Sequence, residues 1–221
     1  MEEKNPYKLC IWKDPSDCNK CSNLGRINCR FSTRLLKTFL IPSLSFMVFT
    51  FAGFIVLGIV IKIWWALIGY IIFLLLFFLI IETRILCSHC PHYSENIRVL
   101  HCYANYGLLK IWPYNPKPMN IFEKVSLIIC FIIFGSFPVS VQSYGLWLIS
   151  TSKDNNSILF FSLIAISILT FISGIVFLVV LNQLFCPYCI NFSCPFNRVS
   201  KNIVGEFLKN NPLILKEWTK C

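Results

Sequence analysis

Four long apolar segments constrain the fold of this chain more than any other feature of its sequence. A helix needs about 20 mainly apolar residues to cross the hydrocarbon core of a bilayer, and each of the four segments is close to that length. They occupy residues 38–60, 65–81, 125–149 and 157–185. The sequence therefore predicts an all-α membrane protein with four transmembrane helices, arranged as two hairpins.

The composition supports the same fold class. Of the 221 residues, 56% are hydrophobic and only 14% are charged, whereas charged residues make up about 25% of an ordinary soluble domain. A chain of this length cannot bury so much apolar surface in a water-soluble core, so lipid must cover part of it. The lipid bilayer is thus the first partner that the sequence predicts.

Positive charge is concentrated on one predicted side of the membrane. Lys and Arg number eight in the leader (1–37), five in the central loop (82–124) and five in the tail (186–221), while the other two loops hold only Lys62 and Lys153. Because basic loops stay on the cytoplasmic side, we expect a multi-pass protein of the cell (inner or plasma) membrane with both termini in the cytoplasm. This topology accounts for the net charge of +10. We expect no nucleic-acid partner, because no basic helix with interleaved aromatic residues is visible outside the spans.

The chain divides into five parts under this topology. They are a cytosolic leader (1–37), a first transmembrane hairpin (38–81), a Cys/His loop (82–124), a second hairpin (125–185) and a tail (186–221). In the tail, Val199, Ile203 and Phe207 recur at helical spacing, which predicts a short amphipathic helix. This helix should end before Pro212. It either lies on the membrane surface or packs against the cytosolic residues.

The two hairpins carry a weak internal repeat. A CxxC pair, Cys87 and Cys90, follows the second span, and another, Cys186 and Cys189, follows the fourth. Two copies of a hairpin with a CxxC at its end would form a pseudo-symmetric four-helix bundle. Within the third span, Pro138 predicts a kink that faces protein rather than lipid.

Cysteine and histidine gather on the side assigned to the cytoplasm. Of the twelve cysteines, only Cys130 lies within a span. Cytoplasmic thiols are kept reduced, and two residues between thiolates let both sulfurs reach one tetrahedral ion. We therefore predict a small Cys/His-rich, metal-binding cap. Its candidate ligands are Cys10, Cys18, Cys21, Cys29, Cys87, Cys90, Cys102, Cys186, Cys189, Cys194, His92 and His101.

The spacing of these residues predicts how they group. The four leader cysteines are sufficient for one four-sulfur site, and the pairs after spans two and four for a second that joins the helix ends. Cys102 and Cys194, with His92 or His101, would complete a third site or replace members of the second. We expect His89 to be an exposed spacer between its neighbouring cysteines. The metal would tie together loops too short and polar to build a core of their own.

Zinc is the expected ion, because structural zinc sites are four-coordinate and accept Cys and His together. An iron–sulfur cluster is the alternative, favoured by the dipeptides Cys90-Pro91, Cys186-Pro187 and Cys194-Pro195, since Cys-Pro closes ferredoxin motifs. Dithiol redox chemistry is the third reading. Helix C-termini disfavour the thiolate on which that chemistry depends, and two of the three CxxC pairs, those after the second and fourth spans, follow such termini.

The sequence leaves three functions open and shows no recognisable catalytic set. The first is a metal-binding scaffold, or the cytosolic part of a membrane enzyme, with a cytosolic protein as a further partner. The second is an electron-transfer or dithiol protein that couples the cytosol to membrane quinone. The third is a small transporter. The aromatic stretch 103–119 is expected to lie in the membrane interface, and its alternative role is a pocket for a lipid headgroup or quinone ring.

Overall fold

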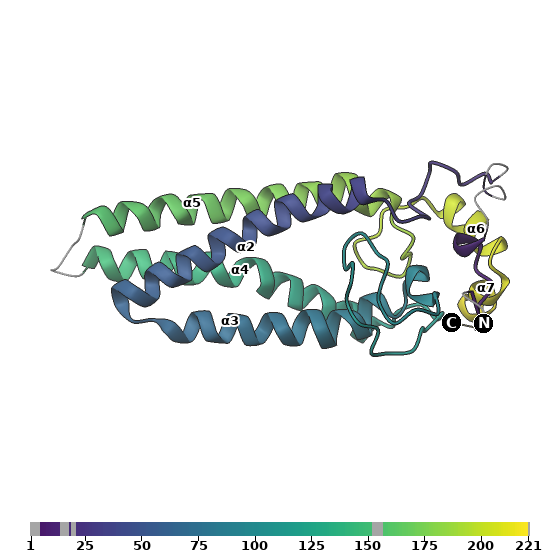
Figure 1. Cartoon of the computed structure of the whole chain (residues 1–221), viewed down its shortest axis with the longest axis horizontal. Coiled ribbons are helices and arrows are strands. Elements are labelled where there is room, and N and C mark those ends of the chain that lie inside the picture. Colours follow the sequence, from purple (N-terminus) through teal and green to yellow (C-terminus); the bar gives the residue numbers. More distant parts are fainter. Residues whose placement is uncertain (1–4, 14–17, 19–20, 152–156, 221) are drawn as a thin grey trace.

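The protein is an all-helical bundle with a compact cap at one end (Figure 1). The computed structural model describes residues 5–13, 18, 21–151 and 157–220. Within these residues, four helices are long and apolar enough to span a membrane, which confirms the predicted fold class. They are α2 (Thr33–Ile61), α3 (Trp64–Leu76) with its π-helical continuation (Phe77–Cys87), α4 (Ile121–Thr151), and α5 (Ser157–Val180) with its π-helical continuation (Leu181–Phe185) and a 3-10 turn (Cys186–Tyr188).

The helices extend beyond the apolar segments from which they were predicted. The first begins at Thr33, and the second continues past residue 81 as far as Cys87. The extra turns hold polar side chains that are buried by the cap, such as Glu82. Hydropathy therefore underestimates the length of these helices, because it registers lipid contact and not burial against protein. The predicted loop at 150–156 lies mostly outside the described residues.

Both hairpins end in the same way, which strengthens the internal repeat. The second helix of each hairpin widens into π-helix at the start of its CxxC pair: Cys87 is the last residue of one π-helix, and Cys186 directly follows the other. Single π-helical turns are rare and occur often at functional sites. The repeated geometry delivers Cys87 and Cys186 to the same end of the bundle.

Leader, central loop and tail meet at that end, beside both chain termini (Figure 1). Two short helices belong to this cap, α6 (Lys201–Lys209) and α7 (Pro212–Trp218). The apolar side of α6 faces the cap, because Phe207 is buried and its ring meets that of Phe192 edge-on at 5.1 Å. Of the two interpretations of the amphipathic tail helix, packing against the cap is the one observed.

The cap has a hydrophobic core of its own, so the expectation that its loops are too polar to build one is wrong. Apolar side chains from the leader, the loop and the tail are mixed within it. The fully or nearly buried members are Leu9, Ile11, Ile27, Tyr93, Leu100, Tyr114, Ile190, Phe207, Leu208 and Ile214. Apart from Phe207 and Leu208 on the predicted tail helix, these residues are scattered over three distant segments, so a local sequence window does not show that they share a core. In the described residues no β-strand forms, and Val99 and Leu109 make one isolated antiparallel bridge.

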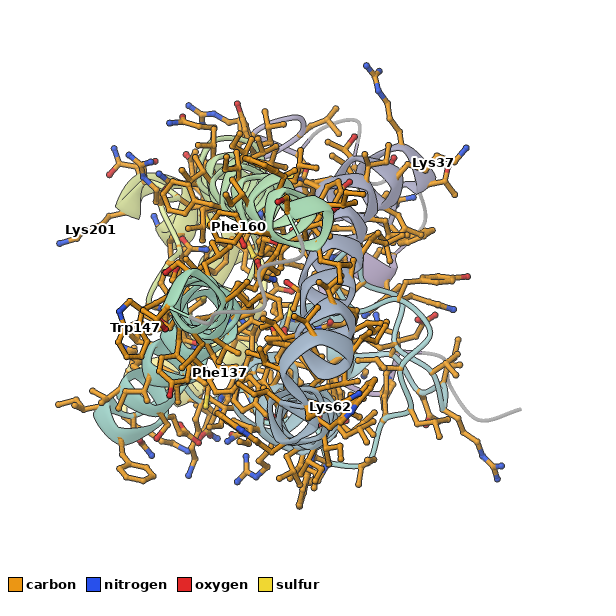
Figure 2. The ribbon with its side chains drawn as sticks, turned by 90° about the vertical axis from the view of Figure 1, so that its left-hand side faces the viewer. Lys37, Lys62, Phe137, Trp147, Phe160 and Lys201 are labelled. Carbon is orange, nitrogen blue, oxygen red and sulfur yellow. The ribbon has the colours of Figure 1, made fainter. Side chains whose placement is uncertain are left out.

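Glycine allows α2 and α4 to approach closely in the half of the bundle away from the cap. A side chain at Gly53 would collide with Gln142, and one at Gly145 would collide with Leu57. Small residues at such crossings are typical of membrane helix pairs, where close packing drives association. Figure 2 looks along the bundle from this far end, where Lys62 marks the turn between α2 and α3.

Pro138 lies inside α4 and is buried, so the interruption faces protein as predicted. Proline has no backbone N–H, which deprives the carbonyl of Phe134 of its helical partner. The hydroxyl of Tyr70, from α3, donates a hydrogen bond of 2.9 Å to that carbonyl. In lipid an unpaired carbonyl is costly, so Tyr70 stabilises the helix that Pro138 interrupts.

We expect Tyr70→Phe to lower the free energy of unfolding in detergent by about 0.5–1.5 kcal/mol, because it leaves the Phe134 carbonyl unpaired. The loss should shrink in a Pro138→Ala background, where the residue-138 N–H is restored. A double-mutant cycle by thermal or denaturant unfolding measures this coupling. Tyr144→Phe, at a half-exposed position, is the control. Equal losses in both backgrounds would contradict the proposed partnership.

Candidate functional site

The structure divides the candidate cysteine ligands into two groups. The leader cysteines are Cys10, Cys18, Cys21 and Cys29. The junction cysteines, where the cap meets the bundle, are Cys87, Cys90, Cys102, Cys186, Cys189 and Cys194. All ten are free thiols, and Cys130 stands apart on α4.

The leader cysteines lie within electrostatic range of one another. A backbone bond from the N–H of Cys21 to the carbonyl of Cys18, at 3.0 Å, closes the knuckle turn that the CxxC spacing predicts. Burial, followed by the neighbouring Cys10, raises the pKa of Cys29 to about 12. Because the charges of Cys18 and Cys21 add to this effect, all four thiols share one neighbourhood.

Asn211 holds the leader to the tail. Its side-chain oxygen accepts a 2.8 Å bond from the N–H of Cys10, and its side-chain nitrogen donates to the Cys10 sulfur at 3.2 Å. Asn211 is fully buried between α6 and α7. Sequence reasoning missed this residue, because a single asparagine before a proline reads only as a helix boundary.

The junction cysteines come from segments about a hundred residues apart. Burial, and then Cys102 and Cys189, raise the pKa of Cys90 well above its ordinary value. Burial, and then Cys189, raise that of Cys194 to about 12. The tail thiols therefore lie close to those of the central loop, as the predicted second site requires. Cys102 and Cys194, which the sequence left between two sites, lie in the same neighbourhood.

Asparagine side chains donate hydrogen bonds that connect the segments of the junction. The side-chain nitrogen of Asn191 donates to the carbonyl of Leu86 at 2.8 Å, which links the tail to the end of the second helix. The side-chain nitrogen of Asn197 donates to the carbonyl of Cys189 at 2.7 Å. The side-chain nitrogen of Asn105 donates to the carboxylate of Glu82 at 2.9 Å and to the Cys87 sulfur at 3.2 Å. These residues position the thiols, and their only sequence signal is proximity to a cysteine.

The three histidines have different environments. His92 is 1% exposed, and neither ring nitrogen meets the full geometry of a hydrogen bond among the described residues, although the backbone of Asn28 interacts with the ring and opposes the fall of its pKa. Burial lowers its pKa to about 4, so the ring is neutral. His101 is half-exposed and lies 2.9 Å from the carboxylate of Glu95. His89 is buried, with Nδ1 2.6 Å from the Lys117 carbonyl, so the prediction of an exposed spacer is wrong.

Metal ligation by these residues stays a prediction. In the part of the chain that the structure describes, no three His, Cys, Asp or Glu side chains are grouped closely enough to hold an ion. The thiols share two neighbourhoods without forming a tetrahedron. His92 lies beside the junction cysteines, whereas His101 is bound to a carboxylate. Ligand roles for both therefore rest on the sequence argument and on these placements.

A cavity of about 970 Å³ adjoins the junction cysteines. All six of them line it, together with His92, Tyr103 and Asn105. Phenylalanine, leucine and isoleucine side chains from α2, α4 and α5 make most of the remaining wall. Tyr103, from the aromatic stretch that we expected in the interface, is buried and forms part of this cavity.

Comparisons with protein-family models, with curated proteins and with solved structures found no match. The function is therefore argued from the geometry of the cap and its cavity.

The raised thiol pKa values predict how the cysteines react. Burial raises the pKa of Cys102 to about 11, so its thiol stays protonated at neutral pH and the reactive thiolate appears only in strong alkali. In chelator-treated protein, alkylation of Cys102 by iodoacetamide should accelerate about tenfold per pH unit up to pH ~10. The same peptide in unfolded protein should level off near pH ~9. Mass spectrometry of the peptide gives both rates, and a plateau at pH ~9 in folded protein would contradict the burial.

Proposed function

We propose that this protein is a multi-pass membrane protein whose cap binds metal ions through the leader and junction cysteines. The convergence of six junction cysteines from the central loop, the tail and the ends of both hairpins supports this proposal most strongly. Bringing buried thiols together across a hundred residues of chain serves no packing purpose that leucine would not serve better. Metal binding would account for thiols from distant segments lying together.

The electrostatics of the cap favour a metal over free thiolates. Burial keeps the thiols of Cys90, Cys102 and Cys194 neutral. A dithiol enzyme instead needs a nearby cation that lowers the pKa of one thiol and stabilises its thiolate. A bound ion supplies that positive charge itself and holds thiolates directly. Zinc is the favoured ion, because it accepts four sulfurs in the leader and a mixture of sulfur with the neutral ring of His92 at the junction.

Bound zinc would join segments that already share a hydrophobic core, so its role extends beyond folding the loops. It would fix the ends of both hairpins relative to each other. A scaffold for a cytosolic protein partner, or the cytosolic half of a membrane enzyme, both fit this role. An iron–sulfur cluster is the alternative occupant, supported by the proline after each of Cys90, Cys186 and Cys194.

A second candidate function is supported by the cavity. Thiols beside an apolar chamber could exchange electrons with a membrane quinone. Two cysteine thiols would lose two electrons and two protons to form a disulfide, and the quinone would gain both pairs to form a quinol. Without a metal, the CxxC pairs Cys87–Cys90 and Cys186–Cys189 are the ones that this reaction would use.

Metal analysis of protein purified without oxygen tests the proposal. We expect about two or three zinc ions per chain, since the leader offers one set of four ligands and the junction one or two more. The pair Cys18→Ser with Cys21→Ser should remove about one ion, and Cys186→Ser with Cys189→Ser another. Cys130→Ser, outside both groups, should leave the content unchanged. Finding iron with acid-labile sulfide would identify the bound group as an iron–sulfur cluster in place of zinc. Finding no metal would overturn the proposal in favour of the dithiol function.

The orientation can be tested separately. We propose that the cap, with both termini, lies in the cytoplasm, because 18 of the 20 Lys and Arg belong to leader, loop and tail. A membrane-impermeant maleimide should leave Cys18 unlabelled in intact cells and label it after permeabilisation in the presence of a zinc chelator. Cys18 suits this test because it is only partly buried. A cysteine introduced in place of Lys62, at the far turn, should show the opposite behaviour. Labelling of Cys18 in intact cells would reverse the topology.

A further inference from the structure

The cavity beside the junction cysteines extends into the membrane part of the bundle. Its wall includes Gly135 and Val139 near the middle of α4, and Thr170 and Gly174 of α5. The ribbons of α4 and α5 diverge towards the cap in both views (Figures 1 and 2). The chamber therefore occupies the wedge between these two helices and is closed at its wide end by the cap.

One side of the chamber is made by residues on the outer surface of the bundle. Ile132, Phe171 and Leu178 all line the cavity. Their exposed fractions are 59%, 55% and 61%, values that mean lipid contact in a spanning helix. Because the same side chains face both the chamber and the bilayer, a ligand can enter sideways from the lipid. A water-soluble molecule would have to cross the cap instead.

The cap end of the chamber is polar but almost uncharged. In the described residues its only charged lining side chain is Arg198, whose guanidinium already donates a 2.9 Å bond to Asn182. Arg198 is thus a single cation, and one cation compensates a phosphate group less than a basic cluster would. The buried ring of His92 lines the same end and offers a nitrogen for a hydrogen bond to a neutral head group.

Aromatic rings dominate the wall between these two ends. Phe39, Phe131, Phe177 and Phe185 contribute from three helices, and Phe131 meets Phe196 of the tail edge-on at 5.4 Å. Aromatic walls suit a planar ring, which they contact with edges and faces. The chamber volume lies at the upper end of the range for small-molecule sites.

We infer that this chamber binds an isoprenoid quinone from the bilayer, with its ring towards His92 and the junction cysteines and its apolar chain between α4 and α5. The inference goes beyond metal binding, and where zinc occupies the junction it needs one ring nitrogen of His92 left free. Lateral access selects a lipid-soluble ligand and the aromatic wall selects a ring, while the cap end offers one cation, Arg198, among neutral polar groups.

Gly135 provides the decisive variant. A Cβ at this position meets no atom within 4 Å and Gly135 lines the chamber, so the side chain of Gly135→Leu has open space in which to extend. Gly69→Leu on α3 is the matched control, because it also meets nothing within 4 Å but lies outside the chamber. Replacing glycine within a helix favours the helix, so both variants should fold. Val139→Phe, one turn along α4, fills the same space if Gly135→Leu is unstable.

The probe is a benzoquinone with a diazirine on its alkyl chain, photolysed with protein in lipid nanodiscs. We expect labelling of α4 and α5 peptides that excess decyl-benzoquinone prevents. Gly135→Leu should weaken this competable labelling about tenfold, because it occupies ligand volume. His92→Phe should weaken it through loss of the ring nitrogens, and Gly69→Leu should match wild type.

Two results would overturn the inference. One is labelling that anionic phospholipid prevents and quinone does not, which would make the chamber a lipid site. The other is equal labelling of Gly135→Leu and Gly69→Leu. Metal content, measured on the same samples, should be unchanged in Gly135→Leu, so failure of quinone binding is separable from failure of metal binding.

Discussion

The pairing of polar groups at the boundary between bundle and cap supports the rest of this structure. Inside lipid, a helix satisfies its own backbone, but where it ends its last carbonyls need other partners. Here those partners come from distant parts of the chain. Asn191 of the tail bonds the carbonyl of Leu86, and the backbone N–H of Asn28 in the leader bonds the carbonyl of Tyr188 at 2.7 Å. Leader and tail are thereby fixed to the ends of both hairpins.

These bonds explain why the thiols converge. Each CxxC pair follows a helix whose end is held by another segment, so its position is set by the bundle and not by the loop that carries it. Burial then removes water from the sulfurs, which keeps them protonated and raises the pKa of Cys90. A cluster of neutral, buried thiols is a poor nucleophile, and the proposed metal would bind there by displacing the protons.

Sequence alone predicted the parts of this protein that depend on local composition. The four spans follow from hydropathy, and the candidate ligands follow from the CxxC spacing. The cap core and the bridging asparagines were missed because they depend on contacts between residues far apart in the chain. Leu9 and Ile214, for example, are both buried in one core, yet they stand near opposite ends of the sequence. His92 and His101 were equivalent in sequence, and only the fold separates a buried ring from one held by Glu95.

The chamber follows from where small and large residues lie along the helices. Gly53 and Gly145 bring α2 and α4 together in the far half of the bundle. Towards the cap, phenylalanine rings stand between the helices: the ring centroid of Phe46 lies 5.4 Å from that of Phe134, which itself lies 6.3 Å from that of Phe177. The chamber is the wedge beside these rings, where Gly135 of α4 and Gly174 of α5 add no side chain. Because the cap closes the wide end of that wedge with cysteines, the packing that opens a path from the lipid also directs it to the thiols.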